Sequence, residues 1–184
     1  MRAPVSFLTG KFYLSKSRNQ SPSDIMRPRR FLTIGPGEDM NWKDNLIENS
    51  QAIRDLLIDS RRIAVLGIRS ERHRDRAAFY VAQYLAAAGL EVIPVPVYEP
   101  DVTEILGQKV YRKLSDVPGE IDIVDVFRRA EDIPPHLEDI LAKKPKAVWF
   151  QSGIRNDQAA RRLAEAGIKV VQDRCLMVEH RWAR

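Results

Sequence analysis

Short apolar runs alternate with stretches of helical periodicity from residue 61 onward. The apolar runs are rich in β-branched residues, as in parallel strands that helices cover on both faces. We expect five strands, at 62–68, 91–97, 121–127, 147–151 and 169–172. We expect helices at 76–88, 131–142 and 156–166, and a short helix at 101–106 that ends at Gly107. The pattern predicts a doubly wound α/β domain with a mainly parallel, five-stranded sheet and helices on both faces.

A helical pattern also precedes the first strand. Its apolar residues recur at helical spacing behind Asn41, which has the side chain of a capping residue: Trp42, Leu46, Ile47, Ile53, Leu56 and Leu57. Residues 1–40 hold no sustained period, and their first acidic residue is Asp24. We therefore expect a disordered extension at 1–40 and one folded domain at 41–184. An organelle transit peptide and translated upstream sequence are the alternatives for the extension.

Length and composition limit the class of protein. With 184 residues, of which 44% are hydrophobic and 30% charged, the chain is long enough for one core and too short for two substantial domains. No apolar run approaches the roughly 20 residues that span a bilayer, so we expect no membrane partner. Cys175 is the single cysteine, which excludes an internal disulfide and favours a cytoplasmic location.

The charge distribution bears on the partner. The net charge is +5 and the pI is about 9.5, but acidic residues are interleaved with the basic ones along most of the chain. Nucleic acid is therefore disfavoured as a partner. Only the N-terminal extension and the segment 69–76 concentrate positive charge.

The turn after the first predicted strand carries the clearest candidate chemistry, because ligands of an open parallel sheet bind beyond the carboxyl ends of its strands. The turn is Gly67, Ile68, Arg69 and Ser70, and the basic residues behind it are Arg72, Arg74 and Arg76. Glycine permits a tight turn, the helix start offers free N–H groups, and Ser and Arg donate hydrogen bonds to phosphate. The turn predicts a phosphorylated ligand. A glycine kept for steric reasons beside a solvated charged loop is the alternative.

Known nucleotide motifs are incomplete here. The turn at Gly67 lacks the second and third glycines of the dinucleotide fingerprint, which disfavours NAD. Glu99 lies well beyond the roughly 20-residue interval expected for an acid that binds ribose. No Lys-Ser/Thr pair of the P-loop type follows the glycine, which disfavours a nucleotide triphosphatase.

The second strand end offers a wall. Pro94, Val95, Pro96 and Tyr98 form a rigid, apolar segment, because proline supplies no N–H to a sheet. Such a segment suits a flat ring or a long apolar chain. An edge strand that proline terminates is the alternative interpretation.

The third and fourth strand ends add polar groups. The third is followed by Phe127, Arg128 and Arg129, although the acids at 131 and 132 are candidate partners for these arginines. The fourth is followed by Gln151, Ser152, Gly153 and Ile154. Both segments face the ligand by topology, and Gly153 has the alternative role of shaping the turn.

Four segments together resemble the CoA-binding domain family, small Rossmann-like proteins similar to the CoA-binding domain of the succinyl-CoA synthetase alpha subunit. The segments are IAVLGIRS, EVIPVPVYEPDVTEILGQKVYRKLSDVP, DIVDVFRRAEDIP and VWFQSGIRNDQAARRLAEAGIKVVQDRC. They span about 62–178, which is nearly the whole predicted domain. The resemblance implies a Rossmann-like fold and coenzyme A, or an acyl-CoA, as the ligand.

The resemblance also implies roles for the strand ends. The CoA phosphates would lie near Gly67 to Ser70 and the arginines behind them. The segment from Pro94 to Tyr98 and the loop at Phe127 would flank the adenosine or the pantetheine, and Gln151 to Ile154 would contact the pantetheine arm. CoA carries a pyrophosphate and a 3′-phosphate, so the arginine cluster has more anion to neutralise than NAD offers.

Few residues suggest catalysis. Cys175 follows Arg174 after the last strand, and a thiol beside an arginine is typical of a reactive cysteine, although free cysteine is more often a small buried residue. The histidines at 73, 136 and 180 do not have the spacing of a metal site. The family's larger relatives carry catalytic histidines on other domains.

We therefore predict a CoA or acyl-CoA binding protein without catalytic activity and without a metal. The alternatives are an acyl- or thiol-transfer enzyme that uses Cys175 and an NAD(P)-binding sensor domain. Two further interactions stay open, which are assembly into a homo-oligomer and binding to a partner enzyme that uses acyl-CoA.

Overall fold

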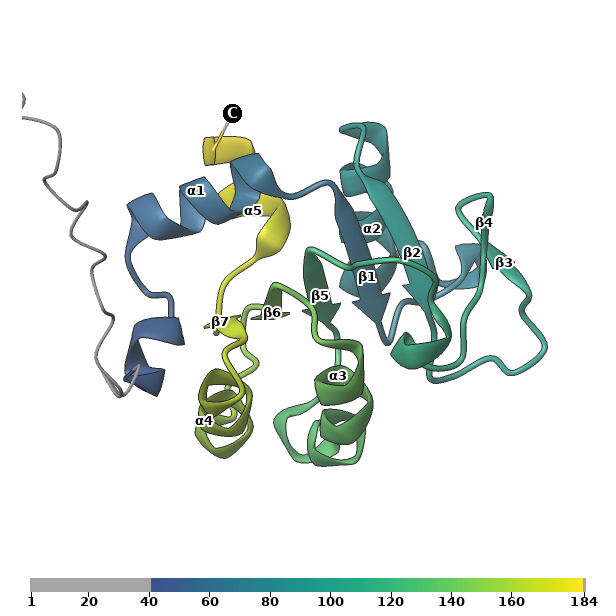
Figure 1. Ribbon diagram of the computed structural model, residues 1–184. Helices are drawn as coiled ribbons and strands as arrows, with labels where there is room; N and C mark the ends of the chain where they lie inside the picture. Colours follow the sequence, from purple (N-terminus) through teal and green to yellow (C-terminus); the bar gives the residue numbers. More distant parts are fainter. Residues whose placement is uncertain (1–40, 184) are drawn as a thin grey trace, which may run out of the picture. The chain divides into compact units, whose positions relative to one another are not determined.

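The apolar runs form a parallel sheet in the computed structural model, which describes residues 41–183. The strands are β1 (Arg62–Leu66), β2 (Glu91–Val95), β5 (Ile123–Val126), β6 (Ala147–Phe150) and β7 (Lys169–Val171). Their order in the sheet is β2-β1-β5-β6-β7, and every neighbouring pair is parallel (Figure 1). All five predicted strands are present, and each ends one or two residues before its predicted end.

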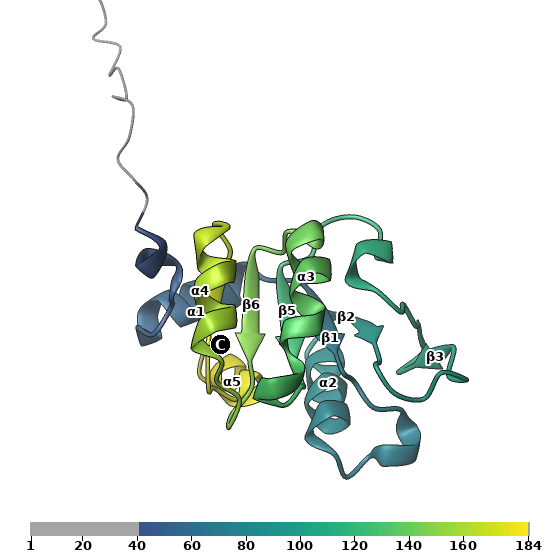
Figure 2. The same cartoon turned by 90° about the horizontal axis from the view of Figure 1, so that it is seen from below.

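Helices cover both faces of this sheet. One face carries α1 (Ser50–Asp59), α2 (Ala77–Ala87) and α5 (Leu176–Ala183), and the other carries α3 (Leu137–Lys143) and α4 (Asp157–Glu165). Figure 2 shows α3 and α4 side by side along β5 and β6. Successive side chains of a strand point to opposite faces, so Trp149 and Phe150 lie in the two different cores, both fully buried. The predicted doubly wound α/β fold is confirmed.

The single helix predicted behind Asn41 is wrong. Trp42–Asn45 forms a short 3-10 helix, η2, whose N-cap Asn41 accepts a hydrogen bond from the N–H of Lys43. The chain then leaves the helix because the N–H of Ile47 donates to the carbonyl of Val170, 2.8 Å away on the edge strand β7. The α-helix α1 begins only at Ser50, capped by Asn49. A contact distant in sequence thus interrupts a continuous helical pattern.

The short helix predicted at 101–106 is also wrong. The segment forms a hairpin of β3 (Glu104–Ile105) and β4 (Gln108–Lys109). Its two turn residues, Leu106 and Gly107, have φ angles of +54° and +71°. Two left-handed residues in succession are typical of the tight turn of a hairpin, so Gly107 shapes a turn and does not end a helix.

Two further helical predictions need correction. The helix predicted at 131–142 begins only at Leu137, after the 3-10 turns η5 (Ala130–Asp132) and η6 (Pro134–His136). The two prolines of η6 supply no N–H to an α-helical ladder, which explains the late start. The C-terminal helix α5 was absent from the sequence-based prediction. The extension at 1–40 lies outside the described residues.

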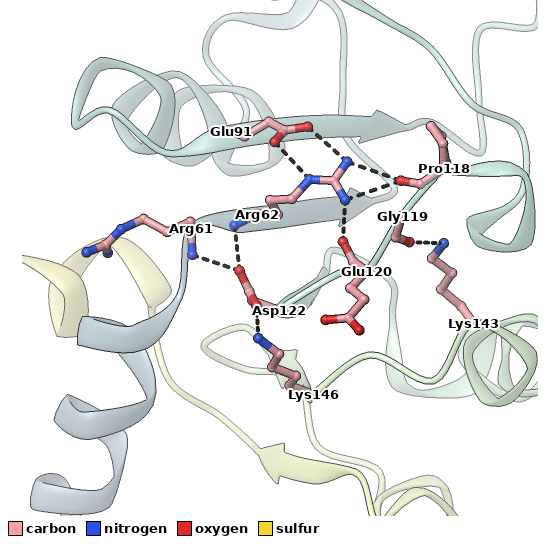
Figure 3. A network of polar contacts seen from close by, with 9 residues as sticks. All are labelled: Arg61, Arg62, Glu91, Pro118, Gly119, Glu120, Asp122, Lys143 and Lys146. Atoms are coloured by element: carbon pink, nitrogen blue, oxygen red, sulfur yellow. Dashed lines mark hydrogen bonds and ion pairs between the residues drawn. The ribbon is translucent and has the colours of Figure 1, made fainter.

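A polar network closes the amino end of the sheet, away from the strand ends where ligands bind (Figure 3). Asp122 accepts hydrogen bonds of 2.8 Å from the N–H groups of Arg61 and Arg62 and one of 2.7 Å from Lys146. The Arg62 guanidinium pairs with Glu91 on β2 at 2.8 Å. Burial alone would raise the pKa of Asp122, but these hydrogen bonds outweigh it and hold the pKa below its ordinary value. The network ties the starts of β1, β2, β5 and β6 together.

Candidate functional site

The candidate site lies where the strand order reverses. The chain passes from β1 to β2 on one side and later returns to place β5 on the other side of β1. A cavity of about 780 Å³ lies there, which we call the strand-end cavity. Its lining comes from the segments after β1, β2, β5 and β6 and from the start of α2: Gly67, Arg69, His73, Arg76, Ala77, Ala78, Tyr98, Phe127, Arg128, Arg129, Ala130, Glu131, Asp132, Gly153 and Ile154. Its size falls in the range of ligand pockets, and a switch point is where such pockets form.

Nine of the seventeen predicted site residues line this cavity. They come from all four strand ends: Gly67, Arg69, Arg76, Tyr98, Phe127, Arg128, Arg129, Gly153 and Ile154. The structure does not bring the other eight into it. Six of them are buried away from it: Ile68, Ser70, Pro94, Val95, Pro96 and Gln151. Arg74 is exposed and does not line the cavity, and Ser152 lines a different one. The proposed wall at Pro94 to Tyr98 therefore reduces to Tyr98.

Gly67 brings the ends of β1 and β5 together. Its φ is +87°, and a Cβ at this position would lie 2.6 Å from the carbonyl oxygen of Phe127 and 3.1 Å from Cδ of Arg128. Any larger residue would push the Phe127 loop away from β1. Glycine is thus required at this position for steric reasons, and the close approach that it permits brings Arg128 to the cavity.

Replacing Gly67 with Ala is expected to lower the free energy of unfolding by roughly 2–3 kcal/mol, from the left-handed φ together with the clash. Gly153→Ala is the matched control, because Gly153 has a φ of +78° but nothing within 4 Å of the position that an added methyl group would take. Chemical denaturation of the two variants measures the difference. Equal losses in both would show that the Phe127 contact costs nothing.

Two arginines converge on Tyr98. The guanidinium carbons of Arg69 and Arg128 lie 4.1 Å and 5.0 Å from the centre of its ring. The Arg128 side chain is only 10% exposed, and its Nη2 lies 3.4 Å from Asp132. Its Nε has no hydrogen-bond partner within residues 41–183. A buried donor without an acceptor costs about 1–3 kcal/mol, so Arg128, although paired with Asp132, keeps one N–H unsatisfied beside the cavity.

The start of α2 adds backbone donors. Arg76 occupies its N-cap position, and no described side chain caps the helix. Ala77 and Ala78, whose N–H groups belong to the first turn, line the cavity. An α-helix start presents N–H groups and a partial positive charge, which together suit a phosphate. The helix start was predicted from the sequence. Ala77 and Ala78 were not predicted as site residues, because they contribute backbone N–H groups and not polar side chains.

Ser70, predicted as a donor to a phosphate, makes its hydrogen bonds inside the protein. It is only 3% exposed, and its N–H and hydroxyl donate to the Glu99 carboxylate at 3.1 Å and 2.6 Å. Burial would raise the pKa of Glu99, but the two bonds from Ser70 and the nearby charges of His73 and Arg69 outweigh it and lower the pKa. The donors expected for a phosphate are thus held by a carboxylate of the chain itself.

Gln151, which the resemblance placed at the pantetheine arm, also makes internal contacts. It is 4% exposed, its Nε2 donates to both oxygens of Asp125 at 2.9 Å and 3.1 Å, and its Oε1 accepts from the N–H of Leu176 at 3.4 Å. Asp125 is fully buried, and burial raises its pKa to about 8 although the Gln151 hydrogen bond acts in the opposite direction. The pair joins β5, β6 and the start of α5. Sequence reasoning did not single out Asp125.

Cys175 lies at a second cavity, of about 760 Å³, beyond the end of β7. We call it the β7-edge cavity, and it is lined by Leu46, Ile47, Glu48, Ser152, Arg155, Val170, Gln172, Asp173, Arg174, Cys175, Val178 and Glu179. Cys175 is half-buried there. The neighbouring Arg174 pairs with Glu179 at 3.0 Å.

The remaining titratable groups form no metal site in the described part of the chain. No group of three His, Cys, Asp or Glu residues there could hold a metal ion. His180 Nδ1 lies 3.1 Å from the hydroxyl of Tyr84, and the pKa of His136 is lowered by burial and by Arg128. Within residues 41–183, no helix is long and apolar enough to cross a bilayer.

Known proteins resemble this chain over most of the described domain. An uncharacterised protein of Bacillus subtilis, YneT, is 40% identical over 128 residues, which is 70% of this chain and 91% of YneT. A solved structure from Thermus thermophilus, cell-free ID.343, is 41% identical with a TM-score of 0.68 and covers 74% of this chain and 100% of its own. A structure from Pyrococcus horikoshii is 34% identical with a TM-score of 0.66, over 74% of this chain and 92% of that one.

A more distant likeness concerns the fold alone. A dinucleotide-forming acetyl-coenzyme A synthetase from Ca. Korarchaeum cryptofilum is 20% identical with a TM-score of 0.52, over 64% of this chain and 27% of that one. The sequence profile of the CoA binding domain matches residues 61–181, which contain all five strands of the parallel sheet and every lining segment of the strand-end cavity. On that match, this chain belongs to the CoA binding domain family.

Proposed function

We propose that this protein binds coenzyme A or an acyl-CoA in the strand-end cavity and carries out no chemistry on it. One observation carries the proposal: a cavity at the switch point of the sheet combines an uncapped helix start with arginines from the loops after β1 and β5. Membership of the CoA binding domain family supports the same ligand class.

The charges favour a ligand with several phosphates. Arg69, Arg76, Arg128 and Arg129 line the cavity together with the start of α2, against the acids Glu131 and Asp132. CoA brings a pyrophosphate and a separate 3′-phosphate, and guanidinium groups bind such anions through paired hydrogen bonds. Because Glu99 already accepts the hydrogen bonds of Ser70, we place the phosphates at the start of α2 and at Arg128.

The aromatic lining supports the nucleotide half of the ligand. Tyr98 is 42% exposed and Phe127 is half-buried, so each offers a ring surface to the cavity. An adenine base stacks on such rings and on guanidinium planes. NAD has less support, because Glu99, the acid after β2 that was considered for a ribose, is held by Ser70.

Binding without catalysis is supported by the geometry of the lining groups. His73 Nε2 lies 3.6 Å from the Glu99 carboxylate, outside hydrogen-bond range, and no Ser, Thr, Cys or Lys side chain lines the strand-end cavity in residues 41–183. Arginines and backbone N–H groups bind and orient anions. They supply neither a general base nor a leaving-group acid.

Isothermal titration of the full chain with CoA, acetyl-CoA and NADPH tests the proposal. We expect saturable binding of CoA or acetyl-CoA and weaker binding of NADPH. No heat with either CoA species would reject the proposed function, and tighter binding of NADPH would favour a sensor domain. After incubation with acetyl-CoA, mass spectrometry should find intact ligand and unmodified Cys175, whereas an acetylated Cys175 would point to a transferase.

A further inference from the structure

The two cavities meet at one turn, between β6 and α4. Gly153 and Ile154 line the strand-end cavity, and Ser152 and Arg155 line the β7-edge cavity. Ser152 and Gly153 are adjacent, so their Cα atoms are about 3.8 Å apart. A ligand that fills the first cavity and extends over this turn therefore reaches the second.

The turn carries no side chain at Gly153, and hydrogen bonds hold its backbone in place. Gly153 has no side chain, and no atom lies within 4 Å of the position that a Cβ would take, so open space lies above it. Its N–H donates to the carboxylate of Asp173 at 2.6 Å, which ties the turn to the loop after β7. Ile154 is bound to the same residue through the backbone, because its carbonyl accepts from the N–H of Asp173 at 3.2 Å. The open space over Gly153 is thus a stable feature of the backbone.

The shape of CoA matches two cavities joined by a bridge. Its charged nucleotide lies at one end, and its thiol lies at the other end of a long, flexible, uncharged arm. When the phosphates are held at the start of α2, the arm has to leave the basic lining, and the turn at Gly153 is the path toward β6 and β7. The thiol or its acyl group then arrives beyond the end of β7.

The lining of the β7-edge cavity mixes apolar surface with charged residues, and four of its five charged residues (Arg155, Asp173, Arg174 and Glu179) are already bonded within the protein. Ile47, Val170 and Val178 supply apolar surface from the segment before α1, from β7 and from α5. Its two arginines are already paired, Arg155 with Asp157 at 2.9 Å and Arg174 with Glu179 at 3.0 Å. A carboxylate on the ligand would have to displace one of these partners, whereas an apolar chain would not.

We propose that the β7-edge cavity receives the acyl group of an acyl-CoA, with the thioester over the turn at Gly153 and the acyl chain against Val178 and Cys175. This inference rests on the proposed function. On this proposal, the affinity of the protein depends on the acyl group as well as on the nucleotide. Longer apolar acyl groups bury more surface in the second cavity and therefore bind more tightly than acetyl.

The single cysteine of the chain reports on this cavity directly. The rate at which iodoacetamide alkylates Cys175 is measured by mass spectrometry, with the full chain alone and with saturating adenosine 3′,5′-bisphosphate, acetyl-CoA or octanoyl-CoA. We expect no protection by the bisphosphate and about tenfold or greater protection by octanoyl-CoA, with acetyl-CoA between them. Calorimetric binding of octanoyl-CoA without any protection of Cys175 would overturn the inference and leave the proposed function intact. Absence of binding by every CoA species would remove both.

A variant that fills the cavity separates direct occupancy from a distant effect. Val178 is 41% exposed on α5, so Val178→Trp is tolerated by the fold and occupies the acyl space. We expect it to weaken octanoyl-CoA about tenfold or more and to leave adenosine 3′,5′-bisphosphate unchanged. Ile58→Trp, at a 50% exposed position on α1 outside both cavities, is the matched control. Unchanged octanoyl-CoA affinity in Val178→Trp would contradict the proposal.

Discussion

Replacing Asp125 with Asn is expected to stabilise the protein at alkaline pH by about 6 kcal/mol. Asp125 is fully buried on β5, and burial raises its pKa from the ordinary value of 3.8 to about 8. That interval corresponds to the stated free energy, since each tenfold change in proton affinity is worth about 1.4 kcal/mol. Asparagine has the shape of the protonated acid, and its carbonyl can accept the hydrogen bond from Gln151 Nε2.

The direction of the pH dependence follows from proton binding in the two states. The unfolded chain loses the Asp125 proton near pH 3.8, whereas the folded protein keeps it until about pH 8. Between these values the folded state binds the additional proton, so the contribution of this group to stability is full below pH 3.8 and is lost as the pH rises to about 8. The Asp125→Asn variant lacks this loss.

Urea denaturation of both proteins at pH 5 and pH 9 measures the effect. The advantage of Asp125→Asn is expected to grow by about 4 kcal/mol between the two pH values. Asp116→Asn, at an exposed position on η4 (Leu114–Asp116), is the control for the removal of a carboxylate and should show no such growth. An advantage that is equal at pH 5 and pH 9 would mean that Asp125 is ionised in the folded protein throughout this range.

Asp122 and Asp125 illustrate what the sequence cannot determine. Both lie in one apolar run, three residues apart, and look equivalent in the chain. Asp122 is held in its charged form by Lys146 and two backbone N–H groups, whereas Asp125 faces one neutral amide in the core. Their pKa values are therefore shifted in opposite directions. The partners that decide this are at least 24 residues distant for both acids.

The fold was predictable because its signals are local. The β-branched runs separated by helical stretches determine the five strands and their parallel arrangement without any contact information. Two of the errors occur where a distant partner decides. Val170 draws Ile47 out of a helical pattern, and the carboxylate of Glu71 accepts from the N–H of Leu106 at the turn of the hairpin. Neither contact can be inferred from the helical periodicity of the residues before the first strand and before Gly107.

The site was predictable to the extent that topology places it. Loops after parallel strands meet at one edge, so Arg69, Arg128 and Gly153 could be grouped from sequence alone. Which side chain of a loop faces the cavity depends on hydrogen-bond partners in other parts of the chain. Ser70 donates to Glu99 and Gln151 donates to Asp125, so the donor groups for which these two residues were predicted are used inside the protein.

Replacing Arg128 with Ala is expected to weaken CoA binding by about 10- to 100-fold, the value of one charge-assisted pair of hydrogen bonds. Arg128 lines the strand-end cavity with a side chain that is only 10% exposed, and its Nε has no acceptor in the described chain. Removal of the side chain therefore takes away an anion partner and leaves no internal hydrogen bond of Nε broken. Calorimetric titration with CoA measures the loss, and the melting temperature should change little.

Arg74→Ala separates a defined site from general attraction. Arg74 belongs to the same basic segment as Arg69 and was an equal candidate by sequence, but it is exposed and does not line the cavity. A surface charge at this position affects CoA only through screened, long-range attraction, so the variant should bind within about twofold of the wild type. Arg54→Ala on the exposed face of α1 provides the same comparison farther from the site. If Arg74→Ala weakened CoA binding as much as Arg128→Ala does, the phosphates would bind at the basic loop after β1 and not in the strand-end cavity.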